Sequence, residues 1–120
     1  MTDRYTTHEY DVLIIGAGGA GLRAAIEASG SGATVGVVCK SLLGKAHTVM
    51  AEGGIQASLG TGDSPRRHFA DAYVGGHGNN EPDLLRVLCE NSSGTIRWLG
   101  QLGCMLDRNE DGTFHLRPGG

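Results

Sequence analysis

Two apolar runs near the start of the chain enclose a segment with helical spacing. Residues 12–15 form a short continuous apolar run, and residues 33–39 form a second one rich in valine. Between them, residues 22–28 place apolar side chains at helical intervals, and glycines at positions 30 and 32 mark where that helix should stop. A strand, a helix and a strand within about 30 residues predict a βαβ unit whose parallel strands are buried on both faces.

Helical spacing returns in the second half of the chain. Ser64 and the proline after it form a typical helix start, so we expect a helix over residues 66–74, closed by the two glycines that follow. A second helix should begin at residues 80–82, and Ser93 should begin a third. The apolar side chains of these helices are spaced as core residues rather than as a cofactor site.

The last part of the chain predicts a β-hairpin. Residues 104–106 and 113–116 are two short runs, and the segment between them is rich in the Asn, Asp and Gly residues that favour tight turns. We therefore expect these runs to pair as antiparallel strands.

The turn between the first strand and the first helix has the spacing G-x-G-x-x-G. Gly16 permits a tight turn, Gly18 lets the backbone approach a pyrophosphate, and Gly21 lets the helix lie close to the strand. Free N–H groups and the helix dipole then face the phosphates. The pattern predicts a dinucleotide-binding site formed by Gly16, Ala17, Gly18, Gly19, Ala20 and Gly21.

The end of the second strand departs from the common NAD-binding pattern. Such units place Asp or Glu about 20 residues beyond the glycines, where it binds the ribose hydroxyls. This chain has Lys40 and Ser41 there instead. The lysine argues against a plain NAD site and leaves two possibilities, NADP or a flavin dinucleotide held differently. In either case Lys40 and Ser41 are candidate contacts for the adenosine or diphosphate portion.

Composition narrows the classes of function. The net charge of −3 provides no basic footprint for nucleic acid. No apolar run approaches the length of about 18 residues that a membrane span needs, and polar residues 1–9 do not resemble a targeting peptide. Three cysteines without C-x-x-C spacing predict buried free thiols, and the scattered histidines predict no metal site. With 21 glycines and 39% apolar residues, the chain is lean for a core of its own.

A longer motif follows the second strand. Residues 47–55 read His-Thr-Val-Met-Ala-Glu-Gly-Gly-Ile. With the glycine fingerprint, this motif resembles the flavoprotein subunit of the succinate dehydrogenase and fumarate reductase family, where a strand ending in Lys or Ser-Lys precedes His-Thr-Val-x-Ala-(Gln/Glu)-Gly-Gly-Ile. The resemblance is sharpest over residues 10–57, and shorter motifs at 68–71, 102–108 and 111–112 follow in the family's order. The closing Arg-Pro-Gly-Gly departs from the longer Arg-x-Phe-Gly-Gly of the family.

The resemblance implies an FAD joined covalently to the protein through His47. A neutral imidazole is a good nucleophile toward the electrophilic methyl group on the benzenoid ring of a flavin, and it is available near neutral pH. The attached imidazole should raise the flavin's reduction potential, which helps it accept a hydride from succinate. Further candidate contacts in the same segment are Thr48, Ala51, Glu52, Gly53 and Gly54.

The resemblance also implies an architecture. The fold class would be α/β, the N-terminal part of a Rossmann-like FAD-binding domain with a parallel sheet. Residues 1–9 would form a polar segment, residues 10–57 the βαβ unit and flavin-attachment segment, and residues 58–120 helices and a hairpin. The family's capping and C-terminal domains would follow Gly120 and would carry the catalytic groups, so we assign no catalytic residue here.

The implied activity is the interconversion of succinate and fumarate by hydride transfer at flavin N5. Electrons would pass to an iron–sulfur subunit, and membrane-anchor subunits would hold the cytoplasmic complex on the inner face of the cell membrane. Two alternatives stay open. An L-aspartate oxidase shares the fold and an Ala-x-Gly-Gly-Ile segment but usually lacks the histidine, so His47 discriminates. A truncated, non-catalytic FAD-binding fragment is the other, and we expect residues 1–120 alone neither to fold stably nor to turn over a dicarboxylate.

Overall fold

The computed structural model describes residues 5–51 and 54–117 of the chain. The chain divides into two compact units, Met1–Gly53 and Gly54–Gly120, which we call the N-terminal unit and the C-terminal unit. Among the residues that the structure describes, no helix combines the length and apolar character needed to cross a bilayer.

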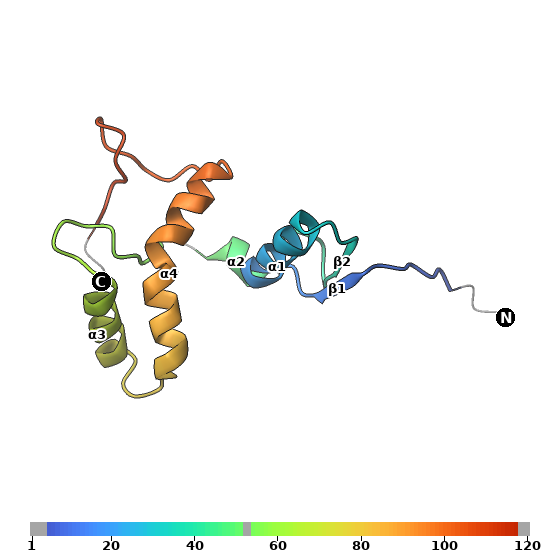
Figure 1. The fold of residues 1–120 in the computed structure, drawn as a ribbon, viewed down its shortest axis with the longest axis horizontal. Helices are drawn as coiled ribbons and strands as arrows, with labels where there is room; N and C mark the ends of the chain where they lie inside the picture. Colours follow the sequence, from blue (N-terminus) through green and yellow to red (C-terminus); the bar gives the residue numbers. More distant parts are fainter. Residues whose placement is uncertain (1–4, 52–53, 118–120) are drawn as a thin grey trace. The chain divides into compact units, whose positions relative to one another are not determined.

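The N-terminal unit is the predicted βαβ unit followed by a short helix (Figure 1). Its elements are β1 (Val12–Ile15), α1 (Gly19–Gly30), β2 (Val35–Val38) and α2 (His47–Met50). The two strands pair in parallel, with Val12 opposite Val35 and Ile15 opposite Val38. This arrangement confirms the α/β expectation, and α1 packs against both strands.

The two faces of this sheet are covered unequally. Side chains alternate between the faces of a strand, and Ile14 on β1 is half-buried beneath α1 whereas Leu13 and Ile15 are 58% and 86% exposed. On the open face, the Tyr10 ring lies over Gly36, where an added Cβ would come within 2.5 Å of a ring carbon. The cover that parallel strands need on both faces, which we expect further strands to provide, is therefore incomplete among the described residues: α1 covers one face and Tyr10 covers only a small part of the other.

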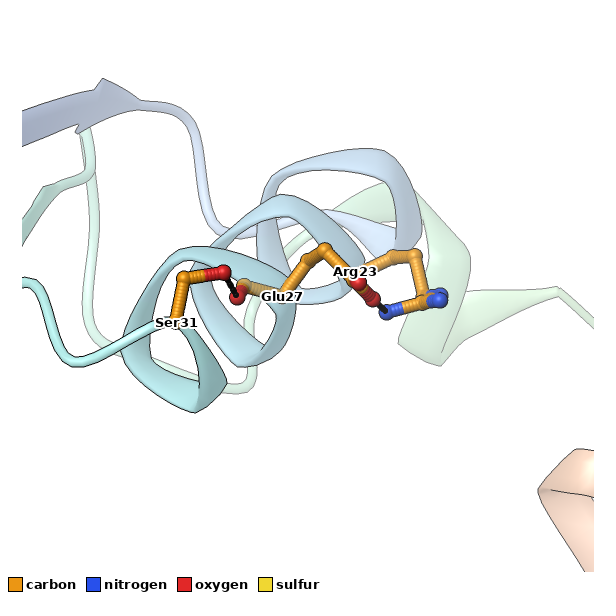
Figure 2. A network of polar contacts seen from close by, with 3 residues as sticks. All are labelled: Arg23, Glu27 and Ser31. Atoms are coloured by element: carbon orange, nitrogen blue, oxygen red, sulfur yellow. Dashed lines mark hydrogen bonds and ion pairs between the residues drawn. The ribbon is translucent and has the colours of Figure 1, made fainter.

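Helix α1 extends beyond the predicted residues 22–28 at both ends. It includes Gly30 and ends at the C-cap Ser31, so of the two predicted stops only Gly32, whose φ is +90°, lies beyond the helix. Figure 2 shows Arg23 paired with Glu27 one turn later, and the Ser31 hydroxyl donating to the Glu27 carbonyl at 3.0 Å. Both charged side chains are largely exposed, so the ion pair contributes only about 0.3–0.5 kcal/mol.

The C-terminal unit contains a pair of antiparallel helices, α3 (Pro65–Gly75) and α4 (Pro82–Gln101), that lie side by side in Figure 1. Ser64 caps α3 as predicted, because its hydroxyl accepts a hydrogen bond from the Arg67 N–H at 3.2 Å. The Asn80 side-chain amide donates to the Ala72 carbonyl at 2.9 Å and so closes the other end of α3.

Helix α4 is continuous, so the prediction that a third helix begins at Ser93 is wrong. Two polar side chains just before that position bond backwards: the Asn91 amide donates to the Val87 carbonyl at 2.7 Å, and the Ser92 hydroxyl donates to the Cys89 carbonyl at 3.0 Å. A residue that starts a helix accepts hydrogen bonds from the N–H groups ahead of it. These side chains therefore continue the existing helix rather than begin a new one.

The buried face of α4 carries three residues at helical spacing. Cys89, Ser92 and Ile96 are 1%, 9% and 6% exposed, and α3 is the helix that packs against α4. Burial raises the pKa of the Cys89 thiol, and the neighbouring Glu90 carboxylate adds to the shift. Ile96 is therefore core, as predicted. Leu84, Val87 and Leu88 are 69%, 55% and 55% exposed, so the expectation that the first half of this helix places its apolar face in the core is wrong for the described residues.

The predicted hairpin is present only next to its turn. Arg108 and Phe114 form an isolated antiparallel bridge, and residues 104–106 lie outside this pairing. The Asp111 carboxylate accepts hydrogen bonds from the N–H and the hydroxyl of Thr113 at 2.9 and 2.6 Å. These bonds close the expected turn directly before Phe114. Among the described residues the bridge does not extend to residues 104–106, so the strand expected there is wrong.

Candidate functional site

The glycine turn joins the carboxyl ends of the two strands. Gly16 has a φ of +109°, which favours glycine, and its N–H donates to the Val38 carbonyl at 2.7 Å. A Cβ at Gly21 would lie 3.0 Å from the Gly16 carbonyl carbon, closer still to its oxygen, and 3.4 Å from a methyl of Ile14. Gly16 and Gly21 therefore have the tight turn and the close helix–strand approach that their spacing predicts.

The N-terminus of α1 is suited to an anion. Gly18 is its N-cap in an extended conformation, no side chain of the cap bonds to the helix, and no acidic residue lies in the first turn. The positive end of the helix dipole is therefore not neutralised by a carboxylate of that turn. Backbone N–H groups at such an end are ready-made ligands for phosphate oxygens, so the described residues fit a dinucleotide diphosphate.

The structure brings the predicted flavin-attachment segment to this helix end. The Gly19 N–H donates to the Thr48 hydroxyl at 3.1 Å, across 29 positions of sequence. His47 is the first residue of α2 and is exposed, and Ala51 follows the helix in an extended conformation. The helical conformation of residues 47–50 was not predicted from the sequence.

Among the described residues, the others predicted to contact the cofactor make no side-chain hydrogen bond that ties them to the end of α1 as Thr48 is tied. Lys40 and Ser41 are exposed just beyond β2, whose carboxyl end is bonded to the glycine turn. Ala17 is 6% exposed, so its methyl belongs to the core, whereas Ala20 is exposed in the first turn of α1. Gly54 is exposed at the start of the C-terminal unit. Glu52 and Gly53 lie outside the described residues.

One polar contact that orients the N-terminal unit was not predicted from the sequence. The Asp11 carboxylate accepts hydrogen bonds from the N–H and the hydroxyl of Thr34 at 2.8 and 2.6 Å, just before the two strands. The Thr34 hydroxyl, followed by its N–H, holds the pKa of Asp11 below its ordinary value. The partners are 23 positions apart, so no local pattern indicates the contact.

Metal and thiol chemistry add nothing to this site. In the described part of the chain, no group of three or more His, Cys, Asp and Glu side chains could hold a metal ion. The three cysteines are free thiols, but only Cys89 is buried, so the expected burial of Cys39 and Cys104 is wrong, since both are exposed.

Comparison with known proteins decides the family. A family model described as FAD binding domain matches residues 11–120. The chain belongs to this family. It is 44% identical over 117 residues to a fumarate reductase (CoM/CoB) subunit of Methanothermobacter marburgensis, a match that covers 94% of the chain and 21% of that protein. It is 36% identical over 124 residues to the succinate dehydrogenase flavoprotein subunit of Rickettsia bellii, a match that covers 100% of the chain and 21% of that protein.

A solved structure agrees with this assignment. The Mycobacterium smegmatis Sdh1 complex in the apo form matches with a TM-score of 0.86 and 46% identity, over 94% of this chain and 20% of that one. These similarities confirm the resemblance to the succinate dehydrogenase and fumarate reductase flavoproteins and the partial Rossmann-like FAD-binding fold. An L-aspartate oxidase of Streptomyces coelicolor is also a relative, 37% identical over 92% of the chain and 19% of that protein. The chain spans about a fifth of the length of these relatives.

Proposed function

We propose that the chain is the FAD-binding part of a flavoprotein that interconverts succinate and fumarate, with the flavin attached to His47. The observation that carries the proposal is the hydrogen bond from the Gly19 N–H to Thr48, because it holds the residue next to His47 against the anion-binding end of α1. Two of the most similar relatives are named as parts of a fumarate reductase and of a succinate dehydrogenase, and these names support the same activity.

In this proposal the cofactor is held along the N-terminal unit and just beyond it. Residues 16–21 surround the diphosphate, and the N–H groups at the start of α1 bind it, except those of Gly16 and Gly19, which are already bonded to Val38 and Thr48. Lys40 and Ser41 bind the adenosine or diphosphate portion. Thr48, Ala51 and residues 52–54 surround the flavin. When bound, FAD supplies a two-electron acceptor whose N5 takes a hydride.

His47 supplies the attachment. Its neutral imidazole would supply the nucleophile for attachment to the methyl carbon on the benzenoid ring of a bound flavin. Exposure of the His47 side chain keeps the imidazole accessible for this reaction.

The remaining parts of the proposal concern the whole protein. Its substrate is a dicarboxylate, its electron acceptor is an iron–sulfur subunit, and membrane-anchor subunits hold it on the cytoplasmic side of the cell membrane. Within this chain, we assign a polar segment to residues 1–9 and the cofactor segment to residues 10–57. Helices and a hairpin occupy residues 58–120. We assign none of these 120 residues to proton transfer during turnover.

Substitution of His47 in the complete polypeptide tests the proposal. After acid precipitation, the wild-type protein should retain flavin fluorescence, and His47→Ser should lose all of it while still binding FAD reversibly. We expect this variant to keep part of its fumarate reduction and to lose most of its succinate oxidation, because the flavin potential falls. His8→Ser, an exposed histidine of the same unit, is the matched control and should retain covalent flavin.

Two results would contradict the proposal in different ways. Covalent flavin in His47→Ser would place the attachment elsewhere. A wild-type protein with reversibly bound FAD that is reduced by L-aspartate would favour the L-aspartate oxidase alternative, which the Streptomyces coelicolor relative supports.

We also propose that residues 1–120 alone are inactive. Besides the open sheet face, the buried residues among those described number five: Ala17, Gly36, Cys89, Ser92 and Ile96. So small a buried set offsets little of the conformational entropy of folding. The 120-residue chain should show no cooperative thermal transition, no bound flavin and no succinate-dependent dye reduction. A stable chain that binds FAD without turnover would instead support the alternative of a non-catalytic FAD-binding fragment. A stable chain with FAD and turnover would contradict the proposed inactivity.

A further inference from the structure

We propose that Thr48 is a positioning residue, which locks α2 onto the N-terminus of α1 and thereby places His47 for covalent attachment. The inference rests on the proposed function, in which His47 carries the flavin. It goes beyond that function because it states what sets the rate of flavin attachment. In this inference the rate depends on a contact within the protein, between the Thr48 side chain and a backbone N–H.

Both branches of the Thr48 side chain fit the glycine turn. Its hydroxyl accepts the hydrogen bond from the Gly19 N–H at 3.1 Å. A Cβ at Gly18 would lie 3.4 Å from that hydroxyl oxygen, and a Cβ at Gly19 would lie 3.3 Å from the Thr48 methyl. The second of these distances is tighter than an ordinary van der Waals contact, so the absence of a side chain at Gly19 gives Thr48 room.

A hydroxyl suits this position because it is a neutral acceptor. It satisfies one of the N–H groups that a helix start leaves unpaired. It adds no negative charge, and the first turn of α1 contains no acidic residue. The positive end of the α1 dipole thus remains available to the phosphates while α2 is held in place.

The contact governs His47 because α2 cannot hold its own orientation. The helix has four residues, and its N-cap Ala46 makes no side-chain hydrogen bond to it. Helices this short are not stable by themselves in water, so tertiary contacts must set their position. His47 is exposed and directly precedes Thr48, so loss of the Thr48 bond frees the imidazole to sample orientations that cannot reach the flavin.

The test compares variants of the complete polypeptide that differ in one atom or group. Thr48→Val removes the acceptor but keeps the shape, and Thr48→Ser keeps the acceptor but removes the methyl. Thr48→Ala forms a second pair with Thr48→Ser, differing only in the oxygen, in case the valine variant does not fold. Thr34→Val is the matched control, because it removes a hydroxyl of the same unit that bonds Asp11 instead.

Two measurements are made. One is the rate at which newly made protein acquires covalent flavin in the expressing cells. The other is the amide hydrogen exchange of a peptide spanning α2 in the FAD-free protein. We expect Thr48→Val to slow attachment about fivefold and to speed exchange by a similar factor, since one hydrogen bond is worth about 1 kcal/mol. Thr48→Ser and Thr34→Val should stay within about twofold of wild type.

The outcomes separate this inference from the proposed function. Covalent flavin in the wild type, with attachment in Thr48→Val and Thr48→Ala as fast as in Thr48→Ser, would overturn the positioning role alone. Unchanged exchange at α2 in those variants would do the same. A wild-type protein without covalent flavin would overturn both.

Discussion

A Cβ at Gly21, in the N-terminal unit, would lie 3.0 Å from the carbonyl carbon of Gly16, whereas a Cβ at Gly94, in the C-terminal unit, would meet nothing within 4 Å. Both glycines lie within helices, α1 and α4. The first is required because a helix passes very close to a strand end. The second is replaceable, since no neighbouring atom depends on the missing side chain.

The hydrogen bonds of the two units differ in the same way. In the N-terminal unit, side chains reach across the sequence: Asp11 bonds Thr34, 23 positions away, and Thr48 bonds Gly19, 29 positions away. In the C-terminal unit, the side-chain bonds of Asn91 and Asp111 span four and two positions. The N-terminal unit is thus organised around one helix end that a ligand can occupy, and the C-terminal unit around local caps and a packed helix pair.

The same substitution in the two units gives the largest and sharpest contrast. In the complete polypeptide, Gly21→Ala should destabilise the protein by about 3 kcal/mol or more and abolish FAD binding, because the methyl group overlaps the Gly16 backbone. Gly94→Ala should stabilise it by about 0.5–1 kcal/mol, since alanine is the better helix former. Denaturant unfolding and flavin content measure both effects. Equal effects would remove the distinction between the units.

The core of the helix pair provides the next largest effect. Ile96→Ala should destabilise the protein by about 2 kcal/mol, because Ile96 is 6% exposed on the packed face of α4. Leu84→Ala is the matched control on the same helix, where the side chain is 69% exposed, and should change stability by less than about 0.5 kcal/mol. FAD affinity should be nearly unchanged in both. A larger effect for Leu84→Ala would mean that further protein covers that side of α4.

Helix caps provide a smaller effect that again separates the units. Ser64→Ala removes the hydroxyl that accepts from the Arg67 N–H and should cost about 1 kcal/mol in thermal or denaturant unfolding. Ser29→Ala, an exposed position inside α1, should stay within about 0.5 kcal/mol of wild type. A Ser64→Ala protein as stable as wild type would show that the α3 cap contributes nothing measurable.

The smallest expected effect is a pH dependence at two exposed aspartates. Thr34 lowers the pKa of Asp11 and Thr113 lowers the pKa of Asp111, in both cases first through the hydroxyl and then through the N–H. A carboxyl whose pKa is lower in the folded protein stabilises the fold above its unfolded pKa, and this stabilisation is lost as pH falls through the folded pKa. The bond at Asp11 joins distant segments, whereas that at Asp111 is local and can persist in the unfolded chain.

Melting curves between about pH 7 and about pH 3 test this contrast. Asp11→Asn should melt below the wild type at neutral pH, and the difference should shrink as the pH falls. Asp111→Asn should show a smaller difference with the same trend. A constant difference across this range would mean that the charge of Asp11 does not carry its effect.

Much of the local structure could be predicted from the sequence. The apolar runs and the glycine spacing indicated β1, α1 and β2, and Ser64 with its following proline indicated the start of α3. One error arose where polar side chains had two possible partners. Asn91 and Ser92 bond back into α4 instead of starting a helix. The hairpin is also shorter than predicted, because among the described residues its turn forms but the Arg108–Phe114 bridge does not extend to residues 104–106.

Some features of the candidate site could likewise be predicted from the sequence, and others could not. The sequence by itself determined the G-x-G-x-x-G turn, because Gly16 needs a positive φ and Gly21 must lack a side chain, and both demands restrict the residue type. The tertiary structure alone decided that Thr48 meets the Gly19 N–H and that Asp11 clamps Thr34. A threonine hydroxyl or an aspartate carboxylate can bond many partners, so its residue type does not specify which distant N–H or hydroxyl it reaches.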